Sequence, residues 1–118
     1  MAGTIVSDTV QDGAGNSTST TNTIKGCAKA WVTFAGSTAT INYSFNVSSV
    51  TRNSTGNYTI NYTTALTNAT NAIATNSTNG WGALYFSSQS ASSVTLINTN
   101  SGGSPVDGSP LSVIVCGN

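Results

Sequence analysis

The chain has 118 residues, about the size of one domain, and its formal net charge is zero. Charged residues make up only 5% of it, and three scattered cations, Lys25, Lys29 and Arg52, are too few to follow a nucleic-acid backbone. The sequence contains no His and no Glu, and its apolar runs are too short for a membrane helix, so nucleic-acid, membrane and acid–base catalytic roles are disfavoured.

Small polar side chains dominate the composition. Thr, Ser and Asn together supply 52 of the 118 residues, while nine aromatic residues and many β-branched residues argue against a disordered chain. A surface with few charges is cheap to desolvate against a partner, and a chain without net charge lacks the self-repulsion that keeps proteins apart. The composition therefore predicts an ordered protein that functions in a crowded assembly.

Residues 1–25 differ from the rest of the chain. A short apolar piece, Thr4, Ile5 and Val6, precedes Asp8 and a run of small polar residues without amphipathic period. This pattern predicts an extended arm, with one strand at its start. Two interpretations stay open: an anchor that becomes ordered on a neighbouring subunit, and a frayed terminus. The segment also lacks the basic and apolar regions of a secretory signal, which predicts synthesis in a cytosol.

Residues 26–118 are predicted to form a β domain. Alternating apolar and polar residues, turn signals and the lack of a sustained 3.6-residue period indicate short strands. The most apolar run, Leu111–Cys116, is expected to be a central strand. The expected strands lie near residues 29–35, 38–47, 57–63, 72–75, 81–88, 92–98 and 111–116. Seven or eight such strands predict an all-β fold, either a small antiparallel β-sandwich or a barrel.

The stretch from Ile41 to Thr63 carries the clearest strand pattern. Its apolar residues alternate with Asn, Ser and Thr on both sides of a turn-forming segment, residues 52–56. The alternating apolar residues are Ile41, Tyr43, Phe45, Val47, Tyr58, Ile60 and Tyr62. The stretch is therefore predicted to be one β-hairpin with a buried apolar face and a wet face of amides and hydroxyls.

Cys27 and Cys116 lie near opposite ends of the chain. A disulfide between them would close a loop of about 90 residues and stabilise the fold by roughly 4 kcal/mol on the chain-entropy model. Synthesis in a cytosol favours two reduced, buried thiols instead. Both states stay open, and neither cysteine has the spacing of a zinc site.

The sequence lacks the residues on which most enzymes depend. Without His, a Ser-His-Asp triad or a Cys-His pair cannot form. Asp8 and Asp12 lie in the arm and Asp107 lies in a Gly/Pro loop, so a pair of catalytic carboxylates is not expected. The same shortage of carboxylates disfavours a metal site, and no cofactor is expected. We predict that the chain is not an enzyme.

Three aromatic residues are candidates for contact with a carbohydrate. Trp31, Trp81 and Tyr85 have small neighbours and would stack on a sugar ring if they are exposed. Packing in the core is the commoner role of such side chains. Nearby amides and hydroxyls would either bind a glycan or be solvated.

Four segments resemble structural proteins of bacteriophage particles. Gly26–Phe34 is similar to the AKAWVNF opening found in many tail-fibre and virion proteins of marine and freshwater phages, and Phe45–Thr51 is similar to a stretch that follows it. Asn53–Thr63 matches the hairpin arm of the same proteins, and Met1–Asp8 is similar to the start of short cyanophage members. The resemblance covers residues 1–66.

The chain departs from this pattern at two places. Asn57 stands where these proteins usually have Asp, and Thr67–Asn71 replaces a common Pro-Asp-Ala-Asn-Tyr stretch. The resemblance supplies no catalytic residues. It implies a virion structural protein, often a homotrimer, that contacts itself and other capsid or tail proteins as a capsid decoration or short fibre subunit at the virion surface, after synthesis in the host bacterial cytoplasm.

Two other functions stay open beside that one. The first is a tail-fibre tip that recognises a host-surface glycan, for which exposed aromatic residues would be the discriminating feature. The second is a depolymerase fibre, which the lack of Glu and His disfavours.

Overall fold

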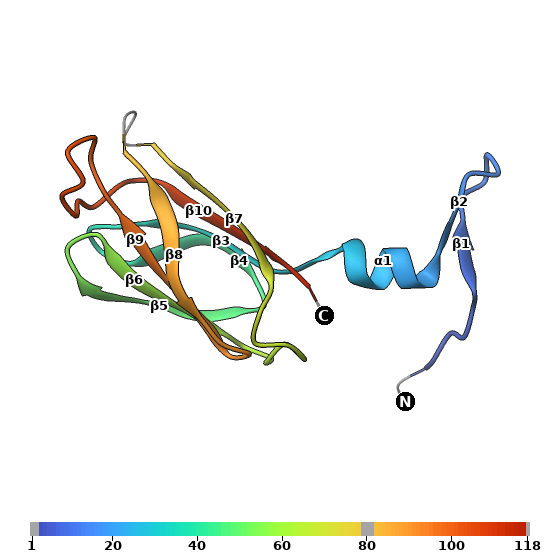
Figure 1. The fold of residues 1–118 in the computed structure, drawn as a ribbon. Coiled ribbons are helices and arrows are strands. Elements are labelled where there is room, and N and C mark those ends of the chain that lie inside the picture. The colour runs from blue at the N-terminus through green and yellow to red at the C-terminus, as the bar shows by residue number, and fades with distance from the viewer. Residues whose placement is uncertain (1–2, 79–81, 118) are drawn as a thin grey trace.

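The computed structural model describes residues 3–78 and 82–117. It is an all-β structure with ten antiparallel strands, of which eight form two four-stranded sheets and two form a small hairpin (Figure 1). One short helix joins the hairpin to the sheets. The elements are β1 (Thr9–Gln11), β2 (Ser17–Ser19), α1 (Thr20–Gly26), β3 (Ala28–Ala35), β4 (Thr40–Phe45), β5 (Val47–Ser54), β6 (Asn57–Tyr62), β7 (Ala72–Ser77), β8 (Leu84–Gln89), β9 (Ser93–Asn98) and β10 (Leu111–Cys116).

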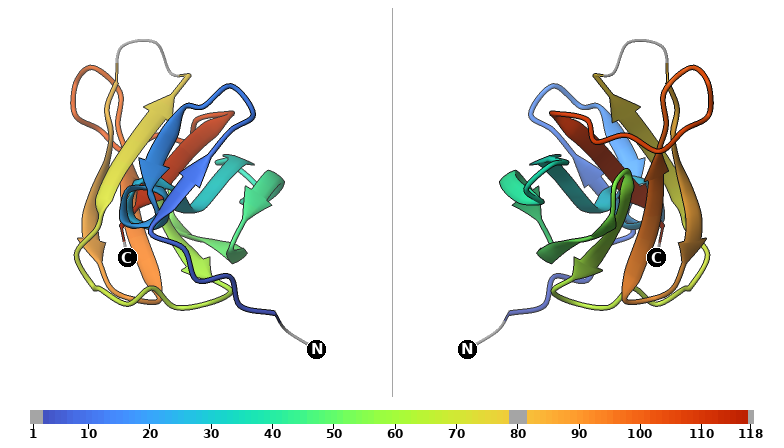
Figure 2. Two further views of the ribbon diagram at one scale, coloured as in Figure 1. Left: turned by 90° about the vertical axis from the view of Figure 1, so that its right-hand side faces the viewer. Right: turned by 90° about the vertical axis from the view of Figure 1, so that its left-hand side faces the viewer.

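The two larger sheets pack face to face (Figure 2). The first sheet has the strand order β4-β3-β10-β7, and the second has the order β5-β6-β9-β8. All pairings within them are antiparallel, as the sequence predicted. The expectation of an all-β fold is confirmed, and the sheets described here do not close into a barrel.

The core lies between the two sheets and is built by period-two alternation. In β6, Tyr58, Ile60 and Tyr62 are buried while the residues between them are only partly covered. Strand β10 lies between β3 and β7, which confirms the expectation of a central strand at Leu111–Cys116. The buried set is Ala30, Val32, Phe34, Tyr58, Ile60, Tyr62, Leu84, Val94, Leu96, Leu111, Val113 and Val115.

Residues 3–26, called the arm below, project from one end of the packed sheets (Figure 1). The prediction of an extended arm is wrong in detail, because strands β1 and β2 pair as a hairpin and α1 follows directly. The Asp12 carboxylate organises the turn by accepting hydrogen bonds from the backbone N–H groups of Ala14 and Asn16, both at 2.9 Å. Helix α1 has only seven residues, too short for an amphipathic period to be seen in the sequence.

The single hairpin predicted for Ile41 to Thr63 is also wrong. Strand β4 pairs with β3 in the first sheet, while β5 pairs with β6 in the second. The chain changes sheets at Asn46, whose φ is +54°. The Asn46 side chain holds this corner: it donates to the backbone carbonyls of Lys29 and Thr64 and accepts from the Thr64 N–H at 2.8 Å. Asn tolerates this left-handed conformation better than most residues do.

A shift in strand register explains why part of the predicted apolar face is not buried. Thr33 lies opposite Tyr43, but the next residue of β3, Phe34, lies opposite Ile41, so Asn42 is an extra residue in β4. A bulge of this kind reverses the alternation of side chains. Ile41 is therefore half-buried against the core, whereas Tyr43 and Phe45 are exposed on the outside of the sheet.

Candidate functional site

The outer face of the first sheet carries an apolar row that crosses all four strands. Trp31 of β3 lies opposite Phe45 of β4 on one side and Ile114 of β10 on the other, and Ile114 lies opposite Ala74 of β7. Trp31 is 37% exposed and Phe45 is 54% exposed. We call this row, formed by Phe45, Trp31, Ile114 and Ala74, the aromatic face. Sequence reasoning selected Trp31 but missed Phe45 and Ile114, because their exposure depends on strand order and register.

A polar row runs beside the apolar one. Tyr43 lies opposite Thr33, Thr33 lies opposite Ser112, and Ser112 lies opposite Asn76. The Thr33 and Ser112 hydroxyl groups are 3.1 Å apart and share a hydrogen bond. An apolar centre flanked by uncharged polar groups is the composition of protein–protein interfaces, in which charged residues are depleted at the centre.

The arm exposes a second set of apolar side chains. Ile5 is 94% exposed and Val6 is nearly as exposed, and both lie in the segment between Thr4 and Asp8 that the sequence selected. Val10 and Ile24 are exposed further along the arm. Full burial of one such side chain by a partner would stabilise the complex by roughly 1.5–3 kcal/mol relative to its exposure to water.

An open groove lies where the arm meets the sheets. It has a volume of about 430 Å³. Its lining residues are Cys27, Ala28, Lys29, Phe45, Asn46, Thr64, Ala65, Leu66 and Thr67. The Lys29 ammonium group donates to the backbone carbonyl of Ile24. Among the described residues, it forms no ion pair with a carboxylate. Since Phe45 belongs to both, this root groove continues the aromatic face.

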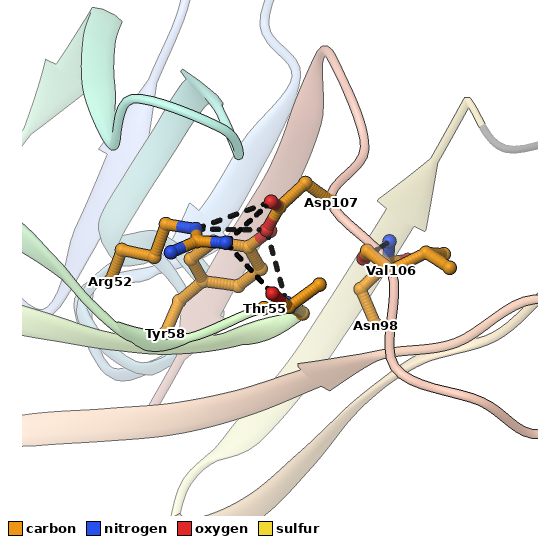
Figure 3. Close-up of polar contacts among 7 residues, drawn as sticks. Arg52, Thr55, Tyr58, Asn98, Val106 and Asp107 are labelled. Carbon is orange, nitrogen blue, oxygen red and sulfur yellow. Dashed lines mark hydrogen bonds and ion pairs between the residues drawn. The ribbon is translucent and has the colours of Figure 1, made fainter.

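A separate polar cluster fixes the far end of the sheets (Figure 3). The Asp107 carboxylate accepts hydrogen bonds from the Arg52 guanidinium, with Nη2 to Oδ2 at 2.7 Å. It also accepts from the Gly56 N–H at 3.0 Å and from the Tyr58 hydroxyl at 2.5 Å. Arg52 in turn donates to the Thr55 hydroxyl at 3.0 Å. The cluster ties the loop before β10 to the β5–β6 turn.

The protonation of this cluster is set by those contacts. The guanidinium of Arg52 holds the pKa of Asp107 well below its usual range, against the opposing effect of burial. Burial, followed by the hydrogen bond to Asp107, raises the pKa of the Tyr58 hydroxyl. An ionised carboxylate already surrounded by donors is suited to structure rather than to proton transfer.

The remaining carboxylates do not join this cluster. Asp8 and Asp12 lie in the arm, while Asp107 lies in the loop before β10. No group of three His, Cys, Asp or Glu side chains placed to hold a metal ion occurs within residues 3–78 and 82–117. Neither does the described part of the chain contain a helix long and apolar enough to cross a membrane.

The other residues selected from the sequence are placed as follows. Tyr85 is exposed on β8, at the edge of the second sheet and away from Trp31. Trp81 lies outside the described residues. Cys27 is exposed and Cys116 is half-buried, and the two are not bonded to each other, so the expectation of two buried thiols is wrong. Alternation explains the position of Cys116, because it follows the buried Val115 in β10 and so faces outwards.

Comparison of the chain with protein-family models finds no match, and comparison with curated proteins and with solved structures finds no significant similarity.

Proposed function

We propose that this protein is a structural subunit of a bacteriophage particle, a small capsid decoration or short fibre subunit at the virion surface. The arm attaches the subunit to a neighbouring protein, and the two-sheet body, a β-sandwich, projects from that attachment. The subunit assembles as a homotrimer and has no catalytic activity. These roles follow the resemblance of residues 1–66 to phage virion proteins.

The observation that carries the proposal is the exposure of the arm. Ile5 is 94% exposed in a segment that lies away from the core of its own chain (Figure 1). A segment that leaves apolar side chains in water is expected to gain stability when a partner covers them. The low charge of the chain lowers the desolvation cost of such contacts.

Incorporation into particles tests this role. Phage particles assembled with the Ile5→Ser, Val6→Ser variant are purified on a gradient, and the amount of this subunit in each particle is measured by mass spectrometry. We expect at least a tenfold loss of the subunit, and a comparable loss when residues 2–25 are deleted. The matched control Thr4→Ser keeps the apolar pair and should incorporate normally. Normal incorporation of the arm-deleted chain would contradict the anchoring role.

A second function is favoured by one specific observation. Trp31 and Phe45 are exposed side by side across β3 and β4, with hydroxyl and amide groups in the adjacent row. Aromatic rings stack on the apolar faces of sugars, so a receptor-binding tip for a neutral host-surface glycan is the alternative. Glycan-array binding by the purified chain that is abolished by Trp31→Ala, and not by Tyr85→Ala, would favour it over a purely structural subunit.

A further inference from the structure

We infer that the aromatic face and the root groove of one copy bind the arm of a second copy of this chain. The inference rests on the proposed assembly role of the arm and names the partner of that arm. Each chain exposes the two surfaces that would meet in this contact. One is the apolar row at Trp31 and Phe45, and the other is the apolar segment at Ile5 and Val6. The arm projects beyond one end of the sheets (Figure 1), so we place the contact between chains.

The sizes of the two surfaces favour the exchange of arms over face-to-face pairing. Four strands spaced about 4.8 Å apart, each with about six residues of 3.3 Å, span roughly 400 Å². A stable interface needs about 800 Å² and 20–30 residues from each partner. The arm adds the 24 residues numbered 3–26 to the surface that each copy contributes. Arm exchange therefore adds residues and contact surface that the face alone does not supply.

The distribution of charge is complementary. The arm carries Asp8, Asp12 and Lys25, for a net charge of −1, and the rest of the chain carries Lys29, Arg52 and Asp107, for a net charge of +1. Since Arg52 and Asp107 neutralise each other, the charge left on the body is that of Lys29, which lines the root groove. Ile5 and Val6 placed against Phe45 and Leu66 would bring Asp8 near this ammonium group.

The contact is heterologous, because it joins the arm of one copy to the face of another. A contact of this kind that does not close extends into an open filament. If it closes, the arms are exchanged reciprocally within a pair or around a ring of copies. Each geometry buries the arm and the face of every copy. An isolated chain, by contrast, leaves both exposed.

Mixing two defective variants tests the inference with the full chain. The arm variant carries Ile5→Ser and Val6→Ser, and the face variant carries Trp31→Ser and Phe45→Ser. The parent is expected to have at least twice the monomer mass of 11.9 kDa by light scattering, and each variant alone is expected to be a monomer. An equimolar mixture should form a 1:1 pair, since one arm and one face remain intact. In face-to-face association the arm variant would remain an oligomer alone.

A control and a second measurement guard against misfolding. Tyr85→Ser removes an aromatic side chain of the second sheet that is 46% exposed, close to the 54% of Phe45, and should leave the mass unchanged. A photoreactive residue at position 5 of the otherwise native chain should crosslink to the segment 29–45 or 64–67 of an isotope-labelled copy. Crosslinks to the second sheet, or a monomeric parent at every concentration, would overturn the inference.

The same variants separate this inference from the proposed function. If the face variant enters particles normally while the arm variant does not, the arm docks on another virion protein, and self-binding is overturned while the anchoring role stands. If neither variant is impaired in particles, the anchoring role itself fails. Binding of a glycan at Trp31 of the assembled oligomer would also overturn the inference, because the arm should cover that side chain.

Discussion

Arg52 and Asp107 are 55 residues apart in the chain, yet their side chains meet with Nη2 and Oδ2 at 2.7 Å. The pair joins the strand β5 of the second sheet to the loop that leads into β10 of the first. Because the Gly56 N–H and the Tyr58 hydroxyl also donate to the same carboxylate, Asp107 is the common acceptor of the cluster.

Replacement of Asp107 by Asn should destabilise the fold. The variant keeps the size of the side chain but removes the charge, and an amide nitrogen would face donors that need an acceptor. We expect a loss of about 1–3 kcal/mol in the free energy of unfolding, the usual worth of hydrogen bonds to a charged group, with the lower end favoured by the partial exposure of the pair. Urea unfolding followed by circular dichroism measures this. Asp8→Asn, the matched control in the arm, should change it by less than about 0.5 kcal/mol.

Below neutral pH, stability should depend on pH only at the acid end. The pKa of Asp107 lies below its ordinary value of 3.8 in the folded chain, so below about pH 4 the unfolded chain binds a proton that the folded chain does not. The free energy of unfolding therefore falls as the pH is lowered from about 4. Since the chain contains no His, it should be nearly constant from pH 5 to 7. Thermal unfolding at a series of pH values checks this, and an equally steep acid loss in Asp107→Asn would contradict the assignment.

Tyr58→Phe should reveal the coupling within the cluster. The Tyr58 ring is buried and packs edge-on against Phe34, with ring centroids 5.2 Å apart, so the substitution preserves the packing. It removes the hydroxyl that donates to Asp107 at 2.5 Å, at an expected cost of about 1–2 kcal/mol. In a double-mutant cycle with Asp107→Asn, we expect a coupling of at least about 0.5 kcal/mol. Additive effects would show that the two groups act independently.

Two glycines with positive φ separate backbone strain from steric crowding. A Cβ atom added at Gly56 would lie 2.5 Å from the backbone oxygen of Asn98 and 2.7 Å from the Val106 nitrogen, whereas one added at Gly103 meets nothing within 4 Å. Both positions require a left-handed conformation, which costs other residues about 1–2 kcal/mol. Gly103→Ala should therefore lose about that amount, and Gly56→Ala about 3 kcal/mol or more. Equal losses in chemical denaturation would argue against the close packing at Gly56.

The two thiols should differ in reactivity. Cys27 is exposed and Cys116 is half-buried, so access favours modification of Cys27. We expect 5,5′-dithiobis(2-nitrobenzoic acid) to react with the Cys116→Ser variant, which retains Cys27, several times faster than with the Cys27→Ser variant. Both variants also carry Ile5→Ser and Val6→Ser, so that no arm of a second copy covers Cys27 in the root groove. Absorbance at saturating reagent gives both rates. Equal rates in the two folded variants, or a faster reaction of Cys116, would contradict the placement of these side chains.

Local sequence pattern was sufficient to locate the strands in which every second side chain is buried in the core. The alternation in β6 and the apolar run of β10 were identified from the sequence, and both contribute buried residues, including Ile60 and Val113. The all-β class follows for the same reason, because a period of two is a property of each strand alone. Candidates in the arm, Ile5 and Val6, were found because they form its first large apolar pair.

The partners of each strand were decided only by the tertiary structure. The stretch from Ile41 to Thr63 reads as one hairpin, but the corner at Asn46 sends β4 and β5 to different sheets, and the extra residue Asn42 turns Tyr43 and Phe45 outwards. Strand order then sets Trp31 between Phe45 and Ile114. Alternation specifies that a strand has two faces; which face meets the core, and which is left for a partner, depends on register and on neighbours distant in the sequence.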